Sequence, residues 1–431
     1  MSTLKVNKLR DTAGSADAIT LDPNGGAVLA GVTTVTSVKV GAAVTISESG
    51  IEASGIGITC ANINGAQIGG RRNIVINGAM NVAQRGTSST SSGRHTVDRF
   101  GVWHDNTDEA PTQAQVDVSS GTTPYANGFR KALKVTNGNQ TSGAGADDYI
   151  WIQQNLEAQD IANSGWNYLS TSSFITLSFW VKSSVAQDFK GYLRTRDGTE
   201  RQYPFSTGSL TADTWTKVTK TIPGNAGLTF DNNVNQGLQI NIGCFFGTNL
   251  TASGVTENAW ASWSGTARVP DMTSTWYTTN DATFEITGLQ LEVGSQATPF
   301  EHRSAGEELT LCHRYYYKLG KLDYLGTHMS ANEIYGIGMS DNDNLNIYGI
   351  INFPVKMRIP PTSIDQSGSA ADYRVRRDTN KDCTAVPTFV NSAEHFCRVN
   401  FPSNSHGWGT GQMLWCQGGS SSSYLGFSAE L

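Results

Sequence analysis

Aromatic side chains set among Ser, Thr and Asn are the residues of this sequence whose types and spacing suit a binding chemistry. The ring of Trp or Tyr stacks on the C–H face of a sugar, while neighbouring polar groups bind its hydroxyls. Trp408 is the strongest candidate, because Gly407 and Gly409 flank it and predict a loop with an exposed ring. For most of the others, a place in an ordinary core or chain interface is the simpler account. The candidate glycan contacts are Trp408, His406, Tyr424, Tyr335, Tyr348, Trp260, Trp263 and Trp276.

Catalysis is not indicated by the nucleophiles and carboxylates. The sequence has no Gly-x-Ser-x-Gly segment, so it lacks the motif that carries the nucleophilic serine of α/β-hydrolases. The adjacent carboxylates Asp147-Asp148 and Glu307-Glu308 point to opposite faces of an extended chain. A glycosidase would need two carboxyls facing one bond, normally from different strands, and nothing in the sequence promotes such a pair. We therefore expect a protein that is not an enzyme and has no catalytic residue.

Metal and cofactor sites are not expected either. Asp341–Asn344 has the oxygen density of a calcium loop but lacks the Gly and Glu that such a loop needs at its sixth and twelfth positions. His302 and His313 are better explained as hydrogen-bonded structural residues than as ligands. The cysteines form no CxxC pair, so they are expected to be small core residues. Whether Cys383 and Cys397 pair stays open.

The elements that must position these residues are short strands. Their spacing is typical of an antiparallel, jelly-roll-like β-sandwich. The alternation of apolar residues slips at Gly288, which predicts a bulge in the closing strand. Asn155–Ala162 is the best helical candidate. The predicted strands cover residues 112–118, 131–136, 148–155, 174–182, 189–195, 215–222, 237–245 and 283–293.

Residues 1–70 differ from the rest because they contain no Phe, Tyr or Trp. Without large side chains, one chain cannot close a core there. The regular glycines and β-branched residues favour a slender shaft whose core is shared between copies, so we expect a homotrimer. A flexible linker is the alternative.

Several phrases of the sequence resemble phage tail fibre proteins. These are RRNIVINGAMNVAQRGTS with TVDRFGVWH, then ITLSFWVKSS, then LQLEVGSQATPFEHR with EELTLCHRYYYK, which together span about residues 71–318. FPVKMRIPP at 353–361 resembles a phrase of fibre tips, and MSTLKVNKLRDTAG resembles the start of cyanophage structural proteins. The resemblance implies a carbohydrate-binding-module-like sandwich in a trimeric host-recognition fibre.

The domain division that follows has four parts. Residues 1–70 attach to the virion and trimerise, 71–303 form the sandwich, 304–318 are a junction with a short connector, and 319–431 form a small β tip that binds the receptor. The expected function is recognition of a host cell-surface glycan, either lipopolysaccharide or capsule-like. A structural tail adaptor or decoration protein without a receptor is the first alternative. A polysaccharide depolymerase is the second.

Composition excludes other partners. The formal charge is −6 and no Lys/Arg block exists, which disfavours nucleic acid. Charged residues make up 16%, below the ~25% of typical domains. No apolar run approaches the ~20 residues of a membrane span, and the first residues lack a secretory signal. We therefore expect a virion component made in the host cytoplasm, bound to other tail proteins through its N-terminus.

Overall fold

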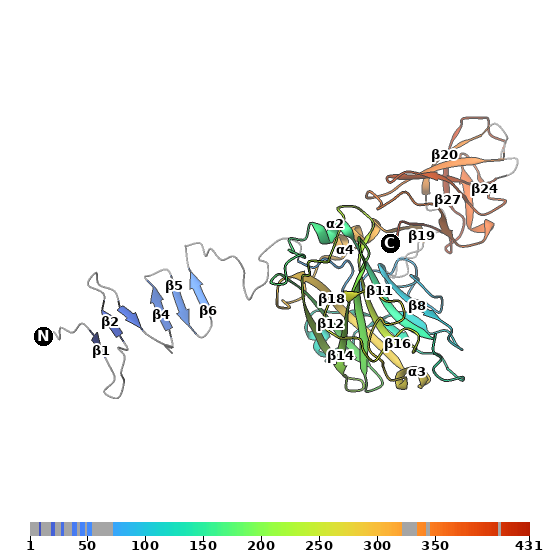
Figure 1. Cartoon of the computed structure of the whole chain (residues 1–431). Coiled ribbons are helices and arrows are strands. Elements are labelled where there is room, and N and C mark those ends of the chain that lie inside the picture. Colours follow the sequence, from blue (N-terminus) through green and yellow to red (C-terminus); the bar gives the residue numbers. More distant parts are fainter. Residues whose placement is uncertain are drawn as a thin grey trace. The chain divides into compact units, whose positions relative to one another are not determined.

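A computed structural model describes residues 72–320, 334–341, 345–403 and 407–431, together with the backbone of six short strands before residue 54. The chain divides into two compact units, Met1–Ala61 and Asn62–Leu431. The first unit holds two three-stranded antiparallel sheets, ordered β1-β2-β3 and β4-β5-β6 (Figure 1). Its strands are β1 (Lys8–Leu9), β2 (Ile19–Leu21), β3 (Ala27–Leu29), β4 (Ser37–Val40), β5 (Val44–Ser47) and β6 (Gly50–Ala53). The predicted shared core of this segment concerns side chains outside the described residues.

The centre of the second unit is a sandwich of two six-stranded antiparallel sheets (Figure 1). The first sheet has the order β15-β12-β18-β10-β9-β7, and the second has the order β17-β14-β13-β16-β11-β8. The strands of the first sheet are β7 (Ser88–Ser89), β9 (Thr112–Asp117), β10 (Lys131–Thr136), β12 (Phe174–Ser183), β15 (Thr216–Pro223) and β18 (Thr283–Val293). Those of the second are β8 (Phe100–Asp105), β11 (Tyr149–Glu157), β13 (Asp188–Thr195), β14 (Arg201–Ser209), β16 (Gln236–Phe246) and β17 (Ala261–Ser262). Three short helices join them: α1 (Thr123–Ala126), α2 (Ala158–Ala162) and α3 (Thr275–Thr278).

The sandwich core follows from period-two alternation along the strands. On β12, Ile175, Leu177, Phe179 and Val181 are completely buried and belong to the same apolar cluster as residues of β16 in the opposite sheet. Each such side chain contributes about 1.5–3 kcal/mol relative to an exposed one. The core therefore lies between the two sheets, and the sandwich is held mainly by these inward faces.

The predicted bulge in β18 is confirmed. Two residues of β18, Gly288 and Leu289, lie opposite the single Phe179 of β12. Gly288 has a φ of 65°, and a Cβ on it would lie 2.6 Å from the ring of Phe129. The extra residue also frees the Leu289 N–H to donate to the carbonyl of Gly78 at 2.9 Å. The bulge thus joins the closing strand to the segment that opens the sandwich.

The junction after the sandwich, predicted as a short connector, contains a helix, α4 (Ala305–His313). Its N-terminus is capped by the Ser304 side chain, which accepts a hydrogen bond from the backbone N–H of Glu307. This Ser-x-x-Glu spacing is a helix-start signal in the sequence. The helix leads into β19 (Tyr316–Gly320), which pairs with β28 (Tyr424–Ser428), and β28 pairs in turn with β22 (Ile364–Gln366).

The remaining strands form a seven-stranded antiparallel sheet with the order β24-β23-β27-β20-β21-β26-β25, which we name the C-terminal sheet. One of its faces packs on a second apolar cluster that includes Tyr373, Val399 and Phe427. The other face carries exposed apolar side chains, such as Ile337 and Met413. Its strands are β20 (Ile334–Ser340), β21 (Ile347–Asn352), β23 (Tyr373–Arg376), β24 (Asn380–Asp382), β25 (Thr388–Ser392), β26 (Phe396–Asn400) and β27 (Met413–Gly418), with a short helix η1 (Ala370–Asp372).

The all-β fold class is confirmed. Each predicted strand range between 112 and 293 matches a strand within about two residues, whereas β14 and the two-residue β17 were not predicted. The predicted helix over 155–162 is half wrong, since β11 continues through Glu157 and only α2 is helical. Cys383 and Cys397 are free, as are Cys244, Cys312 and Cys416, and all five are buried. Cys60 lies outside the described residues.

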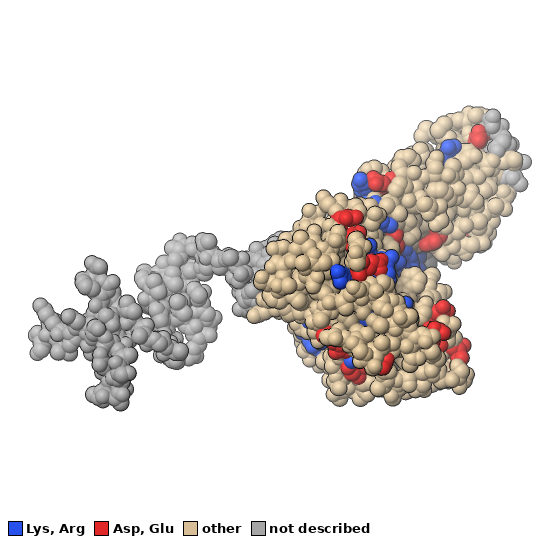
Figure 2. All heavy atoms as spheres, viewed as in Figure 1, with Lys and Arg blue, Asp and Glu red and all other residues tan. Residues whose placement is uncertain are grey.

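The surface matches the low charge of the sequence. Figure 2 shows that the visible surface of the described part is mostly neutral, with the charged atoms in small groups. No helix in the described residues is both long and apolar enough to cross a membrane.

Candidate functional site

The three predicted tryptophans of the sandwich do not form one site. Trp276 is completely buried and donates to the carbonyl of Thr283 at 3.0 Å, so it is a core residue. Trp260 is half-buried and donates to the carbonyl of Pro223 at 2.7 Å. Trp263 is also half-buried, and the Arg194 guanidinium lies 3.7 Å from its ring centroid.

The predicted residues of the C-terminal part are also dispersed. The expectation of an exposed ring at Trp408 is wrong, because the residue is 8% exposed and packs in the second apolar cluster. Tyr335 is buried in the same cluster. Tyr348 is half-buried with the Arg398 guanidinium 4.1 Å from its ring centroid. His406 lies outside the described residues. Among the predicted residues that the structure describes, Tyr424 alone lines a large polar cavity.

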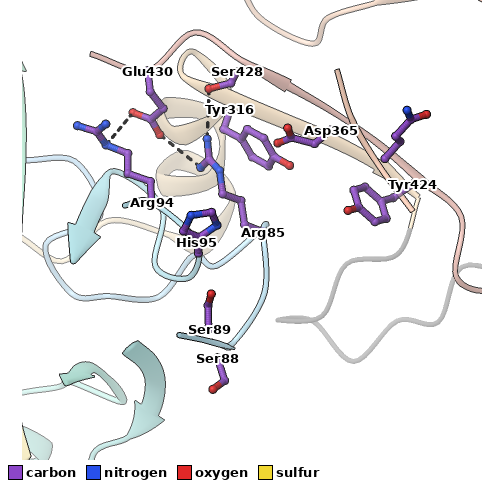
Figure 3. A pocket seen from close by; sticks show the side chains of 11 residues that line it. Arg85, Ser88, Ser89, Arg94, His95, Tyr316, Asp365, Tyr424, Ser428 and Glu430 are labelled. Atoms are coloured by element: carbon purple, nitrogen blue, oxygen red, sulfur yellow. Dashed lines mark hydrogen bonds and ion pairs between the residues drawn. The ribbon is translucent and has the colours of Figure 1, made fainter. Parts of the chain in front are cut away.

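This polar cavity has a volume of about 570 Å³ and opens where the first turns of the sandwich face β19, β22 and β28 (Figure 3). Its lining combines guanidinium, carboxylate, hydroxyl, amide and imidazole groups with two tyrosine rings. From the sandwich come Arg85, Ser88, Ser89, Arg94 and His95, and from the later strands come Tyr316, Asp365, Gln366, Tyr424, Ser428 and Glu430.

Glu430 is the carboxylate around which the arginines of the cavity gather. Arg99, which is completely buried, donates to one Glu430 oxygen in a close ion pair. Arg85 Nη1 lies 3.4 Å from the other oxygen, and Arg94 Nε lies 3.7 Å from the first. Burial pushes the pKa of Glu430 upward, but the three arginines outweigh it and hold the pKa at about 2. Glu430 is therefore ionised at neutral pH and is unsuited to act as a general acid.

The arginines have more positive charge than Glu430 balances. Burial, together with the charges of neighbouring Arg99 and Arg85, lowers the pKa of Arg94 to about 10 against the attraction of Glu430. Nε and Nη2 of Arg94 are buried without a hydrogen-bond partner. Nearby Asp98 is also buried, which raises its pKa to about 6 against the opposing effect of Arg85. Near neutral pH, Asp98 is mostly ionised, and the two carboxylates together offset the charge of two of the three guanidinium groups.

Stacking fixes the cation that faces the cavity. The Arg85 guanidinium lies 3.5 Å from the ring centroid of Tyr316, and Lys318 Nζ lies 4.5 Å from that of Tyr424. Burial raises the pKa of Tyr316 well above its ordinary value, so its phenol stays neutral. The cavity can therefore donate and accept hydrogen bonds and offer an aromatic edge, which suits binding of a polar ligand.

Metal binding finds no support in the part of the chain that the structure describes, where no group of three His, Cys, Asp or Glu could hold an ion. His302 Nε2 lies 2.8 Å from the carbonyl oxygen of Asn127, a contact expected of a hydrogen-bonded histidine. Burial lowers the pKa of His313 to about 4, and its ring packs edge-on against Tyr317. Asp147 and Asp148 do not share a target either: Asp148 accepts from the Tyr277 hydroxyl, and Asp147 from Asn249.

Sequence reasoning missed Arg85, Arg94, Arg99 and Glu430. The available signal was the concentration of arginines: three of them fall within fifteen residues of a chain in which charged residues are only 16%. Their shared partner, Glu430, is more than 300 residues away along the chain, and no local pattern connects them.

Comparisons with known proteins give a weak structural likeness only. No protein-family model and no curated protein matches the chain. A solved structure of bacteriophage CBA120 tailspike protein 4, its enzymatically active domain, aligns at 10% identity and TM-score 0.27, covering 51% of this chain and 21% of the tailspike. A family 11 carbohydrate-binding module from Clostridium thermocellum, in complex with a mixed-linked tetrasaccharide, aligns at 13% identity and TM-score 0.23, covering 50% of this chain and 98% of the module. The N-terminal cellulose-binding domain of Cellulomonas fimi β-1,4-glucanase C aligns at 13% identity and TM-score 0.24, covering 50% and 99%. At such values none of these proteins identifies an activity for this chain.

Proposed function

We propose that this chain is a phage tail fibre protein that binds a host-surface glycan, of the lipopolysaccharide or capsule kind, in the polar cavity. The observation that carries the glycan part is the cavity itself. Its volume of about 570 Å³ falls in the range of small-molecule sites, which is roughly 300–1,000 Å³. The half-buried ring of Tyr424 and the surrounding hydroxyl, amide and charged groups suit sugar faces and hydroxyls. The fibre part is supported by the sequence phrases that resemble tail fibres.

The cavity also bears on which part of the chain recognises the host. It takes Arg85 and His95 from the predicted sandwich (71–303), Tyr316 from the junction (304–318), and Asp365 and Tyr424 from the predicted tip (319–431). We therefore place glycan binding where these parts meet, not in the tip alone. Residues 1–70 would attach the fibre to other tail proteins in the virion.

Association into a trimer is supported by the bare face of the C-terminal sheet. On neighbouring strands, Ile337 lies between Ile350 and Trp415, and Met339 pairs with Met413. Each of these side chains is more than two-fifths exposed. Contiguous apolar patches of this kind mark interfaces. We assign this face to further copies of the chain, because the predicted shaft of residues 1–70 would hold the C-terminal sheets together at high effective concentration.

Binding of the purified full chain to polysaccharide from the host envelope tests the proposal. Tyr424→Ala should weaken binding by about fivefold, because it removes the aromatic edge of the cavity. Tyr125→Ala, which changes a half-buried tyrosine of the sandwich surface, serves as the matched control and should leave binding unchanged.

Other outcomes identify the alternatives. If wild-type protein binds no envelope fraction and antibodies against the C-terminal sheet leave adsorption unchanged, the protein is a structural adaptor. If purified protein clears zones in host capsule, it is a depolymerase.

A further inference from the structure

Arg85 presents a guanidinium group to the polar cavity. This group stacks closely on an aromatic ring but makes only long hydrogen bonds. Stacking on Tyr316, at 3.5 Å from the ring centroid, fixes its plane. Its two polar contacts, Nη1 to Glu430 and Nη2 to Ser428 Oγ, are both 3.4 Å long (Figure 3). Ordinary N–H···O bonds are about 2.9–3.0 Å, and charge-assisted ones are shorter still. Arg85 therefore keeps much of its capacity for a closer anionic partner.

Glu430 is not free to become that partner, because Arg99 already holds it. The close Arg99 contact engages one carboxylate oxygen from the fully buried side. Arg94 approaches the same oxygen and still has two buried nitrogens without hydrogen-bond partners. Three guanidinium groups thus share one carboxylate that Arg99 holds closely, and Arg85 and Arg94, which line the cavity, keep only longer contacts to it.

Two residues of β22 limit which anion fits the cavity. They are Asp365, with its carboxylate, and Gln366, whose amide oxygen is buried without a hydrogen-bond partner. A densely charged polyanion would be repelled by Asp365. A ligand with one anionic group near Arg85 and hydroxyl donors near Asp365 and Gln366 satisfies both the cation and the acceptors.

We propose that the polar cavity binds an acidic saccharide, with the carboxylate or sulfate of one sugar on Arg85 and the hydroxyls of the same or a neighbouring sugar on Asp365 and Gln366. This inference rests on the proposed glycan-binding function and narrows its ligand class. Arginine suits the role because its planar fork binds carboxylate or sulfate through two parallel hydrogen bonds.

Matched oligosaccharides test the ligand class with the full chain. The probes are trigalacturonic acid, its fully methyl-esterified form, and a sulfated galactan oligosaccharide of similar length, measured by titration calorimetry. At least one acidic probe should bind, and the methyl ester should bind at least about tenfold more weakly, since charged hydrogen bonds are the strong ones. Binding should weaken as salt is raised. The uronate and sulfate arms decide which anionic group is preferred.

Two arginine variants make the assignment specific. Arg85→Gln should lower affinity for the acidic probe by about tenfold, and Arg85→Lys should fall between it and wild type, because lysine keeps the charge but loses the fork. Arg130→Gln is the control: Arg130 also stacks on a tyrosine, at 3.9 Å from the Tyr125 centroid, but it is exposed and outside the cavity. Thermal unfolding of each variant separates lost binding from lost fold.

The outcomes distinguish this inference from the function on which it rests. Equal binding of acid and ester, or acid binding that a folded Arg85→Gln variant retains, overturns the acidic-saccharide inference. If in that case Tyr424→Ala still weakens binding of host polysaccharide, glycan recognition in the cavity stands. If no acidic probe binds, the inference falls, and binding of host polysaccharide decides the function separately.

Discussion

The sandwich and the C-terminal sheet are built from similar short antiparallel strands, yet they differ in what covers their apolar faces. In the sandwich, each six-stranded sheet covers the inner face of the other, and Leu169 is its one exposed large apolar side chain among the described residues. The C-terminal sheet has a packed layer on one face only. The exposed large apolar side chains of this sheet and its adjoining loops are Ile334, Ile337, Met339, Leu345, Ile350, Val390, Phe396, Met413 and Trp415. The same alternation along a strand thus yields a closed core where a second sheet exists and a bare apolar face where none does.

The largest expected effect is on the free energy of unfolding, through the covered core of the sandwich. Phe179→Ala empties a fully buried position between the two sheets and should lower the free energy of unfolding by about 3–5 kcal/mol. Met413→Ala changes a side chain that is 64% exposed and should cost less than about 1 kcal/mol in the isolated chain. Denaturant unfolding measures both. Equal losses would show that the C-terminal sheet is covered after all.

The next effect concerns the ion pairs that join the sandwich to the segment after β28. Glu430→Gln leaves Arg99 and Arg94 without their carboxylate, and breaking a buried ion pair costs about 3 kcal/mol when the amide still accepts a hydrogen bond. The control is Asp117→Asn, which breaks an exposed pair with Lys131 at 2.6 Å and should cost about 0–1 kcal/mol. A loss for Glu430→Gln no greater than the control's would mean that the ion pairs do not hold the segment after β28 on the sandwich.

A pH dependence follows from Asp98, which lies in the same polar region. Its pKa is raised from 3.8 to about 6 by burial, so the folded state holds a proton that the unfolded state releases between these values. Its ionisation therefore destabilises the fold fully above pH 6 and not at all below pH 3.8, a difference of about 2–3 kcal/mol.

The test compares wild type with Asp98→Asn from pH 4 to pH 7. The variant should gain stability relative to wild type as pH rises, most of it between pH 4 and pH 6. A stability difference that stays constant with pH would contradict the assignment. Glu430 acts in the opposite sense, because its lowered pKa removes stability as pH falls from 4.5 towards 2.

The smallest effect on the chain itself should come from the bare face. Trp415→Ser changes a side chain that is 43% exposed and should alter unfolding by less than about 0.5 kcal/mol. It should nevertheless weaken association of the chain, measured by sedimentation at several concentrations, because it removes an aromatic anchor from the proposed interface. Leu169→Ser makes a similar change on the sandwich and should leave association unchanged. If both variants associate as wild type does, the bare face has another use.

Much of the fold was predictable because strand alternation is a local property. The run from Ile175 to Val181 predicts its buried face directly, and the phase slip at Gly288 predicts the bulge that the structure contains. Helix α4 was missed although Ser304 and Glu307 carry a start signal, because its apolar residues lack a clear helical period.

The candidate site was much less predictable than the fold. The flanking glycines predicted that Trp408 is an exposed loop residue, but tertiary packing buries its ring. Tyr424 was chosen for its type and polar neighbours, and the cavity around it depends on residues from distant strands. Burial and the approach of Glu430 to Arg85 and Arg99 are set by the assembled fold, which no window of sequence contains.

The buried cysteines allow local opening of the two regions to be compared by chemical labelling. Cys244 and Cys312 lie in the sandwich and in α4, whereas Cys383, Cys397 and Cys416 lie in or beside the C-terminal sheet. Burial raises the pKa of each thiol, so alkylating agents react only after the surrounding strands open. With Cys60 replaced, each thiol can be identified by peptide mass. Its labelling rate then measures how often the strands around it open.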